Sequence, residues 1–330
     1  MEPTRLSVVV PTHDTRELTL RCLGSLGKAM ASGVEVVVVD DGSGDDTAGA
    51  VRDRFPPVLV LRHEAAQGFT ASANDGLRCA RGDVLLLLNS DTEADEHALP
   101  RLVGAFASEP RLGVAAPRLL NPDRSPQWSG GASPTLAWLF LLASGLPAAL
   151  HRVPGYRRVR PVRSETGGRL DWVTGAAMAI RRRAWDEVGP LDTRFRFYAQ
   201  DLDFCLRAQD AGWRVRLVGE AQVVHVGGAT IGLCSGAARR SPHPGLLWTD
   251  LLLWAEKRHG RRWAHAAARR LAFGGRLRLV ARTVVRPLLP PRPRAEWSHD
   301  TEALRLALDE LRRWRAAPQS PPGGYEAGPG

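Results

Sequence analysis

The chain has 330 residues, a net charge of +10 and an ordinary hydrophobic content of 44%, which allows a sizeable core in one large or two ordinary domains. Its cysteines are Cys22, Cys79, Cys205 and Cys234, and none of them forms a CxxC pair. This spacing argues against a zinc site or a disulfide framework and fits a reducing compartment.

The charge is distributed unevenly along the chain. Residues 1–234 hold 27 Lys/Arg and 27 Asp/Glu, whereas residues 235–330 hold the other 18 and 8 and therefore the whole net charge. We expect a neutral, enzyme-like domain followed by a basic region that meets an anionic surface. Nucleic acid, an acidic membrane and a lipid phosphate are all surfaces of this kind.

The N-terminus runs straight into an apolar strand, which predicts no signal peptide and a cytoplasmic location. The most apolar long stretch, residues 135–150, is interrupted by Ser144, Gly145 and Pro147 and is too short to span a bilayer. Any membrane contact is therefore expected to be peripheral, on the inner face of the plasma membrane.

Strands and helices alternate in the first hundred residues, which predicts a mostly parallel sheet with helices on both faces. Apolar runs predict strands at 6–10, 34–39, 58–61 and 84–88, and the intervening patterns predict helices at about 15–31, from 45, after 67–76 and at 97–107.

Farther along, the pattern predicts strands near 113–116, 172–180, 215–218 and 223–226, a helix at 200–211 and a loop at 121–132. Beyond residue 236 it changes to Arg-rich helices at about 246–271 and 301–315, separated by the Pro-rich residues 287–293. The expected domains are thus 1–234, a basic helical region at 235–317 and a disordered tail at 318–330.

Acidic residues follow two of the buried strands, where ligands of open α/β sheets bind. Asp40 and Asp41 end one strand, and Asp91 follows another. Each could instead cap a helix or a turn. Neither GxGxxG nor GxxxxGK[ST] occurs, so a bound nucleotide would have to be held by carboxylates and a metal.

Two further positions have the chemistry of a catalytic site. His225 at a strand end could join Asp91 and a diphosphate around a divalent cation, or be a structural histidine. Asp201 and Asp203 cannot both face one way on a helix, so one could act as a general base while the other pairs with Arg207. Both could equally be favourable acids at a helix N-terminus.

Taken together, the motifs resemble family 2 glycosyltransferases of the GT-A fold, and among them the rhamnosyltransferase-like members. The resemblance covers about residues 5–232. The matching residues are Val8-Val9-Val10-Pro11-Thr12, Val38-Val39-Asp40-Asp41-Gly42-Ser43, Gly68-Phe69, Ala73-Asn74-Asp75-Gly76, Leu88-Asn89-Ser90-Asp91, Thr174-Gly175-Ala176, Arg181-Arg182, Val188-Gly189, Leu191-Asp192, Gln200-Asp201-Leu202-Asp203 with Arg207, and His225 with Gly227-Gly228.

The resemblance implies a role for each part of this set. Asp201 would be the catalytic base, and Asp91 with His225 would hold Mg²⁺ or Mn²⁺. Gly175, Arg181, Arg182 and Gln200 are candidates for acceptor or phosphate contacts, although the two arginines could equally be the solvated start of a helix. The nucleotide-sugar site would comprise Pro11, Thr12, His13, Asp14, Asp40, Asp41, Gly68, Asn74, Asn89, Ser90 and Asp91.

Three residues depart from the family pattern. Gln200 replaces the Glu usual before the base, Ala66 replaces an Asn that usually precedes Gly68-Phe69, and Asn89 replaces the first acid of the metal element. The change at Gln200 bears on the choice of acceptor. Asp201 is kept, so an active enzyme is expected.

The function implied by the resemblance is an inverting, metal-dependent sugar transfer in cell-envelope polysaccharide synthesis. The expected donor is dTDP-L-rhamnose, with a UDP-hexose as the alternative, and the expected acceptor is a saccharide or a polyprenyl-linked saccharide. The composition of the basic C-terminal region fits either contact with an anionic membrane or a solvated, Arg-rich helical appendage packed on the catalytic domain. A non-catalytic nucleotide- or nucleic-acid-binding protein remains the other class of function, although the chain has no recognised nucleic-acid module.

Overall fold

The computed structural model describes residues 5–146, 170–195, 197–227, 244–285 and 291–316. The chain divides into two compact units, one comprising Met1–Pro134 with Arg152–Pro242 and the other Thr135–His151 with His243–Gly330. The expected boundary at 234 and the expected tail at 318–330 lie outside the described residues. The second unit also contains the helix Leu136–Ser144, which lies within the range 1–234 expected for the catalytic domain.

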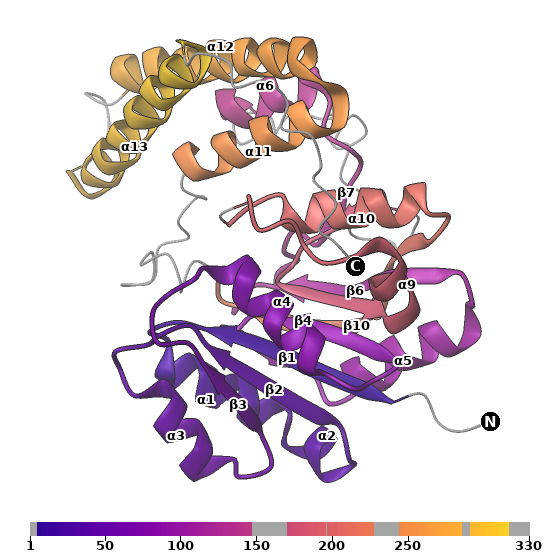
Figure 1. Ribbon diagram of the computed structural model, residues 1–330. Coiled ribbons are helices and arrows are strands. Elements are labelled where there is room, and N and C mark those ends of the chain that lie inside the picture. The colour runs from indigo at the N-terminus through magenta and orange to yellow at the C-terminus, as the bar shows by residue number, and fades with distance from the viewer. Residues whose placement is uncertain (1–4, 147–169, 196, 228–243, 286–290, 317–330) are drawn as a thin grey trace. The chain divides into compact units, whose positions relative to one another are not determined.

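An eight-stranded sheet forms the centre of the first unit, in the order β3-β2-β1-β4-β9-β6-β10-β5 (Figure 1). Strands β9 and β5 run antiparallel to their neighbours and the other pairs are parallel, which confirms the expected mostly parallel α/β fold. The strands are β1 (Leu6–Thr12), β2 (Glu35–Asp40), β3 (Leu59–Arg62), β4 (Val84–Leu88), β5 (Thr92–Ala94), β6 (Leu112–Leu120), β9 (Ala177–Arg181) and β10 (Arg214–His225).

Helices cover both faces of this sheet because its central strands are apolar on both sides (Figure 1). Val8 and Val10 face a core shared with α1, α3 and α5, whereas Val9 faces α4. Helices α9 and α10 lie on the same face as α4. The helices are α1 (Arg16–Ser25), α2 (Gly27–Ala31), α3 (Thr47–Arg54), α4 (Phe69–Cys79), α5 (Ala98–Ser108), α9 (Arg182–Val188) and α10 (Gln200–Asp210).

Two details of the predicted strands were wrong. The strand expected at 172–180 is broken, because β8 (Trp172–Val173) pairs with β7 (Gly130–Gly131) in a separate ribbon before β9 joins the main sheet. The two strands expected at 215–226 are one strand, β10, whose pairing with β6 shifts between Val218 and Gln222. That irregularity lets β10 continue to His225.

Gly76 is required by the close packing of α4 on the sheet. A Cβ atom there would lie 2.3 Å from Val9 Cγ1 and 2.9 Å from Val39 Cγ2, whereas one at Gly24 on α1 would meet nothing within 4 Å. We expect Gly76→Ala to lower the free energy of unfolding by about 1–3 kcal/mol. The control Gly24→Ala should raise it by up to about 1 kcal/mol. Urea denaturation of both variants checks the pair, and equal effects would contradict the packing.

The second unit is helical and contains α6 (Leu136–Ser144), α11 (Pro244–His259), α12 (Arg261–Val285) and α13 (Pro291–Ala316). The single helix expected at about 246–271 is in fact two, because Gly260 with a φ of 80° ends α11 before α12 begins. Of the helices that the structure describes, none combines the length and apolar character needed to cross a bilayer.

Candidate active site

The carboxyl ends of β1, β2 and β4 meet at one edge of the sheet. Thr12 pairs with Asp40 across β1 and β2, and β4 runs parallel to β1 on its other side. Ligands of such sheets bind at this edge. It carries most of the predicted nucleotide-sugar residues, namely Pro11, Thr12, His13, Asp14, Asp40, Asp41, Asn89, Ser90 and Asp91.

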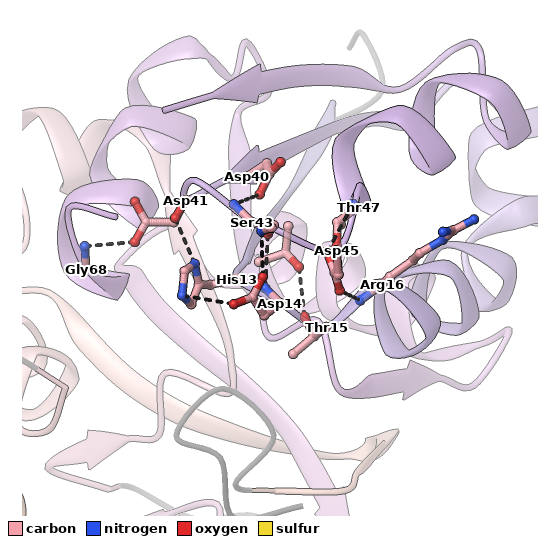
Figure 2. A network of polar contacts seen from close by, with 12 residues as sticks. His13, Asp14, Thr15, Arg16, Asp40, Asp41, Ser43, Asp45, Thr47 and Gly68 are labelled. Atoms are coloured by element: carbon pink, nitrogen blue, oxygen red, sulfur yellow. Dashed lines mark hydrogen bonds and ion pairs between the residues drawn. The ribbon is translucent and has the colours of Figure 1, made fainter. Parts of the chain in front are cut away.

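Asp41 organises the loop that leads into α4 (Figure 2). Its carboxylate accepts hydrogen bonds from the backbone N–H groups of Gln67 and Gly68, each at 2.8 Å, and lies 2.8 Å from His63 Nδ1. Burial alone would raise the pKa of Asp41, but these hydrogen bonds together lower it below its ordinary value. The Asp41 side chain is thus occupied by contacts within the protein, and Gly68 contributes to them through its backbone N–H.

The lowered pKa predicts how Asp41 contributes to stability. Its ionised form is favoured in the folded state, so the contribution is present above the ordinary carboxyl pKa and is lost as the pH falls through the lower folded value. We expect Asp41→Asn to destabilise the protein at pH 7 by about 2–3 kcal/mol and by less at acid pH. Denaturation curves at pH 7 and pH 3 check this, and an equal loss at both would contradict it.

Asp40 differs from its neighbour because only one of its two carboxylate oxygens accepts a hydrogen bond from the described residues. Oδ1 accepts a 3.0 Å hydrogen bond from the Ser43 backbone. Oδ2 is buried without a hydrogen-bond partner among the described residues, with Arg62 Nε 3.6 Å away. A buried carboxylate oxygen in this condition is costly unless a ligand satisfies it.

The residues after β1 are fixed by the loop after β2 (Figure 2). His13 Nδ1 lies 2.8 Å from the Asp41 carbonyl oxygen. Asp14, whose φ is 50°, accepts a 2.7 Å hydrogen bond from the Gly44 backbone and donates its own N–H to Ser43 Oγ. The two loops therefore form one wall beside Asp40.

A group of buried hydroxyls supports this wall from beneath. Thr12 Oγ1 lies 2.8 Å from Thr15 Oγ1 and 2.7 Å from Thr19 Oγ1, and Thr15 Oγ1 is 3.0 Å from Ser90 Oγ. The Thr12 and Ser90 side chains thus join β1 to the loop after β4. By fixing Ser90, these contacts hold the loop that also carries Asn89 and Asp91.

Asp91 and His225 meet because β5 pairs antiparallel with β10, which sets His225 opposite Thr92. His225 Nε2 lies 3.3 Å from Asp91 Oδ1, and the other carboxylate oxygen accepts a 3.0 Å hydrogen bond from the Gly227 backbone. The two residues are far apart in sequence, and the sheet brings them into contact.

Gln127 fixes the tautomer of the His225 ring. Its amide nitrogen donates to Asn121 Oδ1 and to the His225 carbonyl oxygen, both at 3.1 Å, so its Oε1 must be the acceptor of the 2.6 Å hydrogen bond from His225 Nδ1. In the neutral ring Nε2 then carries a lone pair facing Asp91. A lone pair and a carboxylate oxygen that face each other at 3.3 Å favour a cation between them.

Asn89 completes this group of potential ligands. Its Oδ1 is buried without a hydrogen-bond partner among the described residues, and its Nδ2 lies 3.5 Å from His225 Nε2. Oxygen and imidazole ligands suit Mg²⁺ or Mn²⁺. Within the described parts of the chain, no group of three or more His, Cys, Asp or Glu side chains is arranged so that it could hold a metal ion. The residues present fit a cation that takes its remaining ligands from a diphosphate and water.

Asp201 stands at the start of α10 and is joined to the same edge. Its Oδ2 accepts a 2.7 Å hydrogen bond from the Gly175 backbone, and the adjacent Ala176 carbonyl accepts one of 2.9 Å from the Asn89 backbone. Burial raises the pKa of Asp201, although the backbone hydrogen bonds from Gly175 and Leu202 oppose the increase. A buried carboxyl with a raised pKa beside a ligand-binding edge is suited to accept a proton.

Gln200 precedes Asp201 and is 5% exposed. Its Oε1 is buried without a hydrogen-bond partner among the described residues. Asp203, by contrast, forms a 2.8 Å ion pair with Arg207, so the two acids at the start of α10 differ as expected. Gln200 Oε1 is therefore an acceptor beside Asp201 that a substrate hydroxyl could satisfy.

Three predicted site residues are placed away from this group. Arg181 pairs with Val84 at the opposite end of β4, and its guanidinium donates to the carbonyls of Phe106, Glu109 and Leu112. Arg182 likewise binds backbone carbonyls, at the end of α4. The Asn74 amide both donates to and accepts from the Leu191 backbone. These contacts give all three a role in packing.

Sequence patterns alone did not identify two residues of the site. Gln127 lies in a Pro- and Ser-rich loop and contacts His225 98 positions away, and His63 bridges Asp41 and Asp75. Neither belongs to a motif, and only the folded chain brings them to these partners.

Solved structures show which fold the chain has. A mannosyltransferase from Pyrobaculum calidifontis in complex with GDP-Man and Mn²⁺ has a TM-score of 0.55 at 18% identity, over 96% of this chain and 84% of the other. GalNAc-T7 with UDP, GalNAc and Mn²⁺ has a TM-score of 0.52 at 18% identity, over 68% and 44%. Both are GT-A glycosyltransferases, and this chain has that fold.

The sequence profile described as glycosyl transferase family 2 matches residues 7–185, more than half of the chain, and the protein belongs to that family. A similar relative is the N-acetylglucosaminyl-diphospho-decaprenol L-rhamnosyltransferase of Mycobacterium tuberculosis, 29% identical over 67% of this chain and 75% of its own length. The pre-mycofactocin glycosyltransferase of the same organism is 30% identical over 67% and 42%. The protein is thus a glycosyltransferase.

Proposed function

We propose that the protein transfers a sugar from a nucleotide donor to a hydroxyl acceptor with inversion at the anomeric carbon. The observation that supports the proposal is that hydrogen bonds connect the residues suited to a cation with the buried carboxylate suited to accept a proton. Asp91, His225 and Asn89 form a site suited to a cation, and the hydrogen bonds through Ala176 and Gly175 hold Asp201 beside it. One side would bind the leaving diphosphate while the other accepts the acceptor's proton.

The reaction is a single in-line displacement. The acceptor hydroxyl donates its proton to an Asp201 carboxylate oxygen as its own oxygen attacks the anomeric carbon, and the bond from that carbon to the diphosphate breaks. Gln200 Oε1, which lacks a partner, would accept a hydrogen bond from the acceptor and orient it. A single displacement without a protein nucleophile inverts the anomeric configuration.

Asp91, His225 and Asn89 would hold Mg²⁺ or Mn²⁺, and such an ion offsets the charge that develops on a departing diphosphate. Asp40 Oδ2, which has no hydrogen-bond partner among the described residues, would bind the base or ribose of the nucleotide, with His13 and Asp14 forming the wall beside it.

For the donor we propose dTDP-L-rhamnose, with a UDP-hexose as the second candidate. The similarity to a rhamnosyltransferase supports the first, and the similarity of fold to enzymes solved with UDP or GDP-Man leaves the nucleotide open. The test is turnover with each donor and a soluble acceptor, with the product anomer assigned by NMR. Retention of the donor's anomeric configuration would exclude the mechanism, and turnover only with UDP-hexoses would exclude the rhamnosyl donor.

For the acceptor we propose a polyprenyl-diphosphate-linked saccharide of cell-envelope synthesis, met on the cytoplasmic face of the plasma membrane. The similarity to an enzyme named for a diphospho-decaprenol acceptor supports this, as does the concentration of positive charge beyond residue 234. We expect the native protein to sediment with the cell-membrane fraction at low salt and to be released from it at high salt.

The hydrogen bond from His225 to Gln127 predicts an effect on cation affinity. We expect Gln127→Leu to weaken Mn²⁺ binding by about 10–100-fold, because the ring loses the acceptor that fixes its tautomer and orientation. Gln127→Glu keeps an acceptor at that position and should bind Mn²⁺ within a few-fold of the wild-type protein. Titration followed by electron paramagnetic resonance checks both, and equal losses would contradict this role for Gln127.

A further inference from the structure

The outer face of α12 carries a continuous row of exposed apolar side chains. Phe273, Leu277, Val280 and Val284 are 60%, 40%, 61% and 67% exposed. Their spacing of four, three and four residues places them along one side of the helix. We call these four residues the α12 stripe. The row extends over about 16 Å of the helix axis.

The stripe is not needed for the core of the helical unit. The opposite side of α12 packs closely, since a Cβ atom at Gly274 would lie 2.6 Å from the Phe140 carbonyl oxygen of α6, and one at Gly275 would lie 2.7 Å from Trp248 of α11. Within the stripe, only Phe273 has a described ring contact, a stack on Phe140 with centroids 5.6 Å apart. The stripe therefore remains open to a partner.

Positive charge surrounds the stripe. Helix α12 contains seven arginines and no acidic residue. Arg269 precedes Phe273 by four residues and Arg276 precedes Val280 by four, so both lie along the row, and both are exposed. At one end of the stripe, Arg269 and Arg270 line a hollow of about 300 Å³ together with Leu136, Ala266 and Phe273.

We propose that the α12 stripe docks on an anionic phospholipid bilayer. The four apolar side chains would enter the boundary of the acyl chains while the arginines bind lipid phosphates, which is how basic amphipathic helices lie on membranes. Because no described helix can span a bilayer, the contact lies along the surface.

Charge and composition favour this occupant over two others. A second copy of the chain would bring the exposed Arg269, Arg270 and Arg276 of another acid-free helix against the same arginines of the first, and like charges would repel. Nucleic acid would satisfy the arginines but not Leu277, Val280 and Val284, because aliphatic side chains gain nothing from a phosphate backbone. An anionic bilayer satisfies both parts of the surface.

The test is flotation of the full-length protein with phosphatidylcholine vesicles that contain or lack phosphatidylglycerol. We expect Phe273→Ser/Val284→Ser to weaken binding to the anionic vesicles about 10–100-fold. Arg269→Ser/Arg270→Ser should weaken it about tenfold or more, and only on vesicles that contain phosphatidylglycerol. The control Leu59→Ser/Leu306→Ser changes residues of similar exposure, 46% and 51%, outside the stripe and should bind as the wild-type protein does.

The inference deepens the membrane contact proposed above but is tested without it, because flotation needs neither donor nor transfer. The stripe variants should also keep wild-type affinity for the nucleotide, so failure of sugar transfer and failure of docking are separate results. Binding of the stripe variant to anionic vesicles at wild-type strength would overturn the proposal. A change in sedimentation from dimer to monomer in the variant without lipid would also overturn it, because the stripe would then be a protein interface.

Discussion

Replacing the buried carboxylate at the start of α10 should nearly abolish sugar transfer. We expect Asp201→Asn to lower kcat by about 10²–10⁴-fold, since the amide cannot accept the proton of the acceptor hydroxyl. The amide oxygen can keep the hydrogen bond from the Gly175 backbone, whereas the 2.8 Å hydrogen bond from the Leu202 backbone to the other carboxylate oxygen is lost. The measurement is the transfer rate at saturating donor and acceptor, together with nucleotide affinity, which should not change.

The raised pKa of Asp201 gives this variant two controls. The rate of the wild-type protein should fall on the acid side with a pKa above the ordinary value for Asp, and the residual rate of the variant should lack that limb. Since the raised pKa contributes stability only at low pH and loses it as the pH rises, Asp201→Asn should melt no lower than the wild-type protein at pH 8. An Asn variant with full activity would exclude Asp201 as the base.

The second large effect is expected at the proposed cation site. Asp91→Ala should lower the rate by about 10²–10³-fold at fixed Mn²⁺, because charge on the departing diphosphate is no longer offset. It should also remove the dependence of nucleotide binding on Mn²⁺. The loss cannot be replaced by His225, whose Nε2 lies 3.3 Å from the missing carboxylate and can supply only one ligand.

Ser90→Ala is the matched control for this variant. Ser90 is the next residue in the chain, and its hydroxyl lies 3.0 Å from Thr15 Oγ1, within the supporting group of hydroxyls. We expect a change in stability of about 1 kcal/mol and a rate within a few-fold of the wild-type protein. Comparable losses of Mn²⁺ dependence in both variants would show that the loop, rather than the Asp91 carboxylate, determines cation binding.

The strands and the site edge could be predicted in part because apolar runs such as Val84–Leu88 are a local signal. Their acidic ends followed from the same pattern. From the residues alone, a meeting of Asp91 with His225 was one of two open interpretations, and only the resemblance favoured it. The contact depends on antiparallel pairing of β5 with β10, which no local pattern encodes. The break in the helix at Gly260 was missed because Arg-rich helical periodicity continues through it.

Residues with similar sequence signals can have different roles, and only the folded chain distinguishes them. Asp40 and Asp41 are adjacent and equally acidic, but Asp41 is used by Gln67, Gly68 and His63, whereas one oxygen of Asp40 is left without a hydrogen-bond partner among the described residues. Likewise, an arginine such as Arg181 is a residue type that often binds phosphate. However, β9 runs antiparallel to β4, so Arg181 lies at the end of β4 that is far from Asp91. Strand direction, which sequence does not display, decides such cases.

The central claim is that the carboxyl edge of the sheet binds a nucleoside diphosphate through a cation held by Asp91 and His225. The most direct measurement is calorimetric titration of the unmodified protein with dTDP and with UDP, each in the presence and absence of Mn²⁺. We predict saturable binding of at least one nucleotide that Mn²⁺ strengthens by tenfold or more. Absence of binding to both nucleotides with Mn²⁺ present, or binding that is identical with and without it, would contradict the claim.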